Sequence, residues 1–142
     1  LYEVRGAVDG LAARLAALRI GSDAIGRAEL ERALQAGRDA DDTTSLAILI
    51  ACDVDFHRAI YRLSGNPAIE ETVSAQWPHM RRSMATVLAE LGYRASAWTE
   101  HEAIAACILK ADADGAEAAA RAHAVTAGQF TEQRLATASQ AA

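Results

Sequence analysis

Apolar residues recur every three or four positions along most of the chain, and this spacing limits the fold to helices. In the first segment they share one helical face, at Leu1, Val4, Val8, Leu11, Leu15 and Leu18. Aromatic residues make up only 5% of the sequence, and a core of alanine and leucine favours closely packed helices over a sheet sandwich. No segment alternates apolar and polar residues as a half-buried strand does. We therefore predict an all-α protein.

Breaks and capping residues divide the 142 residues into six predicted helices. These helices span about residues 1–19, 22–36, 43–64, 67–91, 96–111 and 114–136. The predicted N-caps are Ser22 or Asp23, Thr43 or Thr44, Asn66 and Asp114, the last with Glu117 as a capping-box partner. Pro78 should kink the fourth helix, because its ring removes a backbone hydrogen bond, and Gly92 should end it. No long linker is present, so residues 1–142 form a single predicted domain.

Charge and cysteine content narrow the functions that the chain can have. A net charge of −5 argues against direct binding of nucleic acid, because phosphate contacts need a basic face. Cys52 and Cys107 lack CxxC spacing and suit a reduced, cytoplasmic protein. The longest apolar run, in SLAILIAC, is far shorter than the roughly 20 residues of a membrane span. We predict a cytoplasmic protein without a membrane partner.

Four side chains are candidate metal ligands: Asp53, His57, His101 and His123. Asp53 and His57 are four residues apart, so a helix places both on one face, roughly 6 Å apart. His101 and His123 lie on apolar or small-residue faces of two later helices, which should point inward. One carboxylate and three imidazoles from three helices suit a divalent transition metal, such as zinc, nickel, cobalt, manganese or iron.

The alternative is that these histidines are ordinary core residues, each satisfied by a hydrogen bond. Spacing alone leaves both interpretations open, since Asp-x-x-x-His is a weak motif. Burial of several polar groups without partners is costly, however, and one metal ion would satisfy all of them together.

Four segments resemble the landmarks of a known family. In chain order they are LYEVRGAVDGLAARLAA, DVDFHRAIYRLSGNP, EHEAI and ADADGAEAAARAH. In combination they resemble the FCD domain, the C-terminal effector-binding domain of FadR-type regulators in the GntR family. The similarity covers Leu1 to about Phe130. One departure is Asp9, which stands where the first helix of many members has a glutamate.

The resemblance implies an antiparallel bundle of six to seven helices around a central pocket for ligand and metal. In the metal-binding branch an Asp and three His hold a divalent ion, and they match Asp53, His57, His101 and His123. Zinc is the first candidate. The resemblance also implies a homodimer, a small organic acid as effector, and DNA binding only through an N-terminal winged helix-turn-helix domain. That domain should precede Leu1, and a start without Met favours a chain excised from a longer regulator.

Basic residues are the candidates for binding the carboxylate of such an effector, because the planar guanidinium suits it best. Arg5 matches an arginine that is common on the first helix of the family. Arg82, Arg81 and His79 follow Pro78 and are further ligand-binding candidates. For each arginine the alternative is a solvated surface side chain, and His79 could instead cap the kink at Pro78.

Three functions fit these sequence features. The leading prediction is a non-enzymatic effector-sensing domain of a transcriptional regulator. A metal-dependent enzyme acting on a small carboxylate is the alternative, although Glu102, next to His101, should face away from the metal and no other general base is evident. The third is an interaction bundle with core histidines and no metal.

Overall fold

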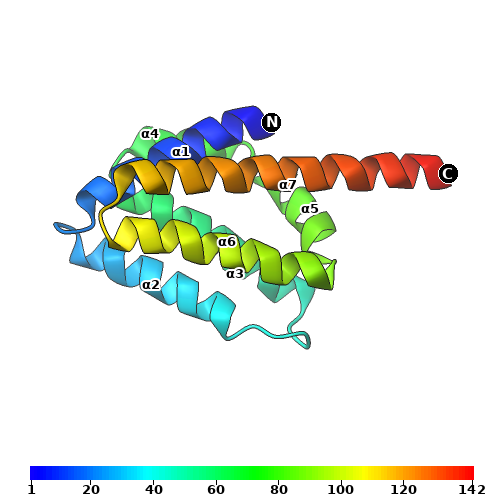
Figure 1. Cartoon of the computed structure of the whole chain (residues 1–142), viewed down its shortest axis with the longest axis horizontal. Helices are drawn as coiled ribbons and strands as arrows, with labels where there is room; N and C mark the ends of the chain where they lie inside the picture. The colour runs from blue at the N-terminus through cyan, green and yellow to red at the C-terminus, as the bar shows by residue number, and fades with distance from the viewer.

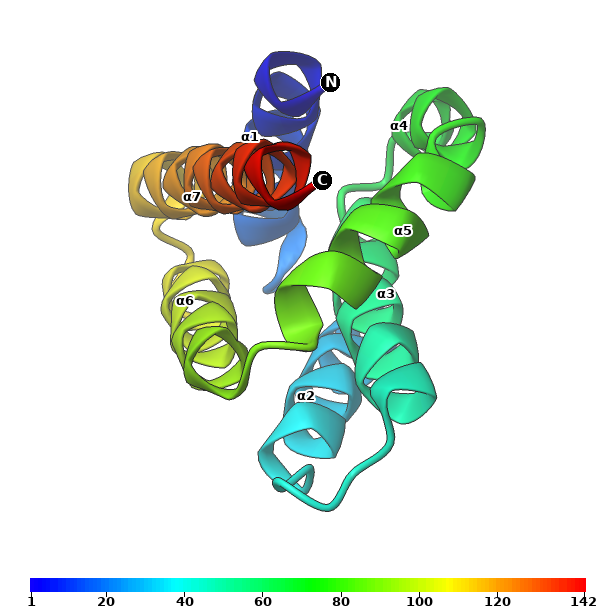
Figure 2. The same cartoon turned by 90° about the vertical axis from the view of Figure 1, so that its right-hand side faces the viewer.

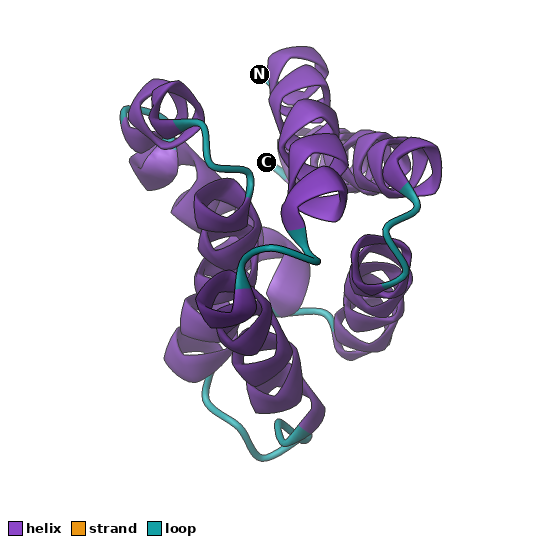
Figure 3. Cartoon of the chain, turned by 90° about the vertical axis from the view of Figure 1, so that its left-hand side faces the viewer, coloured by secondary structure: helices purple, strands orange, loops and turns teal.

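The computed structural model describes all of residues 1–142, which form seven α-helices and no strand (Figure 1 and Figure 3). The helices are α1 (Tyr2–Arg19), α2 (Ala24–Arg38), α3 (Leu46–Leu63), α4 (Pro67–Ser74), α5 (Trp77–Leu88), α6 (Leu91–Leu109) and α7 (Ala113–Ala141). The long helices pack as an antiparallel bundle, and α7 runs past the other helices at its C-terminal end (Figure 1). The all-α prediction is confirmed. None of the helices combines the length and the apolar character that a membrane span requires.

The closest pair of helices is α1 and α7, which lie side by side (Figure 2). Small residues make this approach possible: a Cβ on Gly6 would lie 3.6 Å from the Cβ of Ala124, and one on Gly128 would lie 2.8 Å from the ring of Tyr2. Apart from Arg5 and Asp9, the buried face of α1 is therefore built of glycine and alanine. Val4, Leu11 and Leu18 of this helix remain exposed instead.

The predicted fourth helix is wrong, because the structure contains two helices there. α4 ends at Ser74 and α5 begins at Trp77, which puts Pro78 in the first turn of α5. A proline is tolerated in a first turn, where its missing N–H has no helical partner. The chain therefore starts a new helix before Pro78 instead of kinking at it. The start of α4 follows the prediction, with Gly65 at φ +70° and Asn66 accepting from the Ala68 N–H.

Two later boundaries also differ from the prediction. α6 begins at Leu91, so Gly92 lies in its first turn rather than ending a helix. α7 begins at Ala113 and is capped by Asp112, whose side chain accepts from the Gly115 N–H at 2.9 Å. The predicted capping box at Asp114 is wrong, because that residue already lies inside the helix. α7 also runs to Ala141, beyond the predicted end.

The N-cap of α3 is Ser45, which accepts from the Ile48 N–H, and not Thr43 or Thr44. Both threonines instead hydrogen-bond Asp41 in the preceding loop. Asp23 caps α2, as one of the two predicted alternatives. These caps fix where α3 starts, and hence which of its residues face the middle of the bundle.

Candidate metal centre and effector cavity

Three histidines meet in the middle of the bundle. His57 comes from α3, His101 from α6 and His123 from α7, and each is at most 4% exposed. One ring nitrogen of each lies within 4.8 Å of the other two, and the Nε2 atoms of His101 and His123 are 3.2 Å apart. The structure thus brings together the three histidines that the sequence analysis singled out.

Asp53 lies one turn before His57 on α3 and points at the same place. Its Oδ1 is 3.1 Å from His57 Nε2 and 3.7 Å from His101 Nε2. Neither contact has hydrogen-bond geometry, so this buried oxygen has no donor. A buried carboxylate oxygen without a partner is costly in a protein interior, and a cation between it and the imidazoles would satisfy it. The four residues therefore fit a divalent metal by chemistry and by position.

Burial affects the protonation of Asp53, His57 and His101. Desolvation disfavours the imidazolium form, so the pKa of His101 lies well below its usual value and that of His57 is also lowered. Burial alone raises the pKa of Asp53, but the three histidines outweigh it, and the pKa falls below its usual range. Neutral imidazoles and an ionised carboxylate are the forms that bind metals.

Glu100 orients one of the histidines from outside the cluster. Its Oε2 lies 2.5 Å from Nδ1 of His123, which leaves Nε2 of that ring directed at the other histidines. A carboxylate on the second ring nitrogen is the usual support of a metal-bound histidine. No sequence pattern singles out Glu100, since Glu102 adjoins His101 equally. Glu102 pairs with Arg38 at 2.5 Å and lies away from the cluster.

Arg5 of α1 closes another side of the cluster. It is only 7% exposed, its Nε donates to Asp9 Oδ2 at 3.1 Å, and its Nη2 lies 3.1 Å from His57 Nε2. Asp9 in turn accepts from the hydroxyl of Tyr61 at 2.5 Å. Burial opposes the charge of Arg5, but Asp9, Tyr61 and Asp53 outweigh it and raise its pKa. Arg5 is thus a fixed buried cation beside the cluster, and not a solvated surface residue.

Aromatic rings hold His101 in place. Phe56 stacks on it at 4.2 Å between ring centroids, and Trp98 packs edge-on at 4.7 Å. Trp98 lies against Gly37 of α2 so closely that any Cβ there would clash with the indole. These contacts give Trp98 a packing role.

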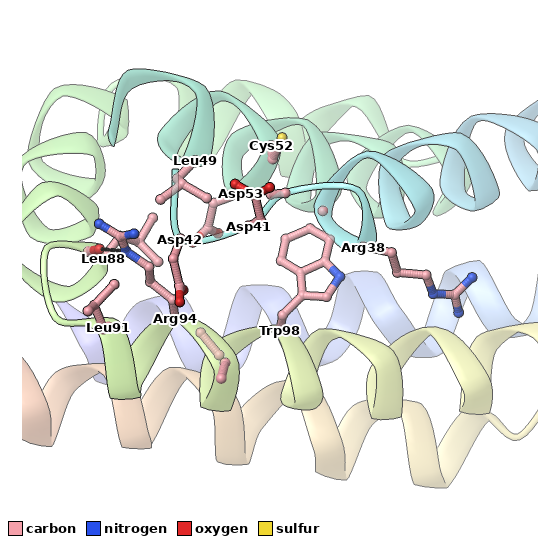
Figure 4. A pocket seen from close by; sticks show the side chains of 14 residues that line it. Arg38, Asp41, Asp42, Leu49, Cys52, Asp53, Leu88, Leu91, Arg94 and Trp98 are labelled. Atoms are coloured by element: carbon pink, nitrogen blue, oxygen red, sulfur yellow. Dashed lines mark hydrogen bonds between the residues drawn. The ribbon is translucent and has the colours of Figure 1, made fainter. Parts of the chain in front are cut away.

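Three cavities adjoin the cluster, and one of them, of about 10 Å³, lies between α1, α3, α6 and α7. The larger of the other two, of about 270 Å³, lies between the α2–α3 loop, α3 and the start of α6. Figure 4 shows Asp53 and Cys52 on the α3 side, facing Arg94 and Trp98 of α6 across this space. The smaller of these two, of about 20 Å³, is lined by residues that include Arg5, Asp53, Ser83, Tyr93 and His123. Asp53 and Ala97 line both of these cavities.

The other three predicted ligand-binding residues are not brought to the cluster. His79, Arg81 and Arg82 are all exposed on α5, where Arg82 Nη2 lies 2.6 Å from His79 Nδ1. Met84, Val87 and one polar α5 residue, Ser83, line the cavity of about 20 Å³. Ser83 hydrogen-bonds Tyr2 of α1 and Thr131 of α7.

A comparison with protein families matches residues 1–126 to the FCD domain. Because this match covers most of the 142 residues, the chain belongs to the FCD domain family. The FCD domain is a ligand-binding regulatory domain of GntR-type transcription factors, as the resemblance in the sequence implied. A comparison with curated proteins finds no significant match.

Proposed function

We propose that this chain is the effector-sensing domain of a GntR-type regulator, and that Asp53, His57, His101 and His123 hold a divalent metal, with zinc as the first candidate. The observation that carries the proposal is the meeting of these four donors in the core, with a buried Asp53 oxygen that no protein group satisfies. When bound, such a metal supplies a positive centre with coordination positions open to a ligand oxygen.

The effector in this proposal is a small organic carboxylate that binds beside the metal. Arg5 supports it, since a buried guanidinium next to the cluster provides the second positive charge that a carboxylate favours. Binding would change the DNA affinity of an attached DNA-binding domain, provided that the effector has unequal affinity for two arrangements of the regulator. The proposed setting is the cytoplasm.

A homodimer is part of the same proposal. Val4, Leu11 and Leu18 are 63%, 43% and 65% exposed and recur at seven-residue intervals along α1. A regular apolar stripe of this kind suits packing against a helix of a second subunit.

The test is the metal content of the purified protein, measured by mass spectrometry after loading with zinc. We expect about one ion per chain in the wild type and a loss of most of it in His101→Ala and His123→Ala. His79→Ala is the matched control, because it removes an exposed histidine and should retain the metal. Equal metal content in all four proteins, or none in the wild type, would contradict the proposal.

A further inference from the structure

The cavity of about 20 Å³ beside the cluster is sized for a single ligand atom or water. Its volume is just above the ~10–15 Å³ that one water molecule needs. Arg5, Asp53 and His123 line it, so whatever occupies it lies between the buried cation and the proposed metal ligands.

Tyr93 contributes the one hydroxyl of this cavity that has no partner. Its oxygen is buried and makes no hydrogen bond. The other hydroxyl, on Ser83, is already engaged with Tyr2 and Thr131. An unpaired buried hydroxyl lowers the stability of the folded state. The Tyr93 hydroxyl makes no hydrogen bond that would offset this cost.

The ring of Tyr93 is held by packing and does not depend on its hydroxyl. It lies in the first turn of α6 and packs on Phe130 of α7 at 4.4 Å between ring centroids. Burial, and after it the carboxylates of Glu100 and Asp53, raise the pKa of Tyr93 to about 12. The phenol is therefore protonated at neutral pH and available as a donor.

We propose that Tyr93 is an effector-binding residue, which donates a hydrogen bond to a carboxylate oxygen of the ligand within the cavity of about 20 Å³. This inference rests on the proposed function and deepens it. Arg5 carries a positive charge and presents only donors, and the Tyr93 hydroxyl can donate as well. Together they favour an anionic acceptor over a neutral amide or an amine of the same shape. The domain should accordingly select small carboxylates.

Tyr93→Phe tests this, because it removes the hydroxyl and keeps the ring on Phe130. The probes are acetate, L-lactate and succinate, titrated calorimetrically into zinc-loaded protein, with acetamide as the neutral analogue. We expect at least one of the three carboxylates to bind the wild type and acetamide not to bind. The variant should bind that carboxylate about tenfold more weakly, with unchanged metal content.

The melting temperature distinguishes a ligand-binding role of the Tyr93 hydroxyl from a structural role. Without carboxylate, Tyr93→Phe should melt at the same temperature as the wild type or higher, since a buried unpaired hydroxyl is lost. The matched control is Tyr2→Phe, which removes a phenol that is hydrogen-bonded to Ser83 and Thr131. It should melt lower and keep its carboxylate affinity.

Unchanged carboxylate affinity in Tyr93→Phe would overturn the inference and leave the metal centre standing. So would a melting temperature lowered as in Tyr2→Phe without any loss of affinity. A zinc-loaded wild type that binds none of the three carboxylates would also overturn it. Absence of bound zinc in the wild type, in contrast, would contradict the proposed function.

Discussion

Arg5 with His57, and Arg82 with His79, are the same pair of side chains in two different environments. In each pair a guanidinium nitrogen lies close to a ring nitrogen, at 3.1 Å and 2.6 Å respectively. The first pair is buried among Asp9, Asp53 and the other histidines, whereas the second is exposed on α5. The shorter distance belongs to Arg82 and His79, whose interaction is screened by solvent. Burial, and not proximity, is therefore what makes such a pair part of a binding site.

The largest expected difference between the two pairs is in stability. Arg5→Ala should lower the free energy of unfolding by about 3–5 kcal/mol, because it leaves Asp9 as a buried charge without its cation. Arg82→Ala should change it by no more than about 0.5 kcal/mol. Urea denaturation of both variants measures this contrast. Similar losses in the two would show that burial does not separate the pairs.

Removal of the metal should lower the stability only of proteins in which the buried histidine cluster is intact. With free zinc at about 100 times its dissociation constant, binding adds about 2.7 kcal/mol to the stability of the folded state. We expect a chelator to lower the melting temperature of the wild type and of His79→Ala, but to leave that of His101→Ala unchanged. A chelator effect of equal size in all three proteins would locate the metal outside the cluster.

Glu100→Gln tests whether the contact between Glu100 and His123 contributes to metal affinity. The amide keeps the shape of the side chain but removes the negative charge next to His123 Nδ1. Loss of such a partner typically weakens metal binding by about 10–100-fold. Glu102→Gln is the matched control, because Glu102 pairs with Arg38 instead. Competition with a chromogenic chelator gives both affinities, and equal values would refute the role of Glu100.

The smallest expected effect is on the pH dependence of the metal-free protein. Burial lowers the pKa of His57 and His101 from the ordinary value of 6.5, so the unfolded chain binds more protons than the folded one below that pH. Stability should therefore fall as the pH drops below 6.5, toward the lowered values. Urea denaturation at several pH values checks this. His79→Ala should follow the wild-type curve, and a flat wild-type curve would contradict the burial argument.

The sequence allowed much of the fold and the four metal candidates to be predicted, because both depend on local spacing. Asp53 and His57 share a helical face by their spacing alone. Glu100 could not be recognised in this way, since its partner His123 lies on another helix and only packing brings them together. Tyr93 was missed for the same reason: its proposed role rests on a buried hydroxyl without a partner, which no sequence pattern reveals.

The basic residues of α5 show the opposite error, since they were predicted to bind the ligand and do not reach the cluster. Arg81, Arg82 and His79 were candidates because a carboxylate needs cations or hydrogen-bond donors. The chain begins α5 at Trp77, and its inward positions go to Met80 and Met84. That register turns the basic residues toward solvent. Sequence spacing alone did not show that this face of α5 points to solvent.

The most direct test of the metal centre is an anomalous difference map from a crystal of the zinc-loaded protein. We predict one strong peak per chain, about 2.0–2.1 Å from ring nitrogens of His57, His101 and His123 and within bonding distance of Asp53. A peak at His79, or no peak among the three buried histidines, would contradict the account.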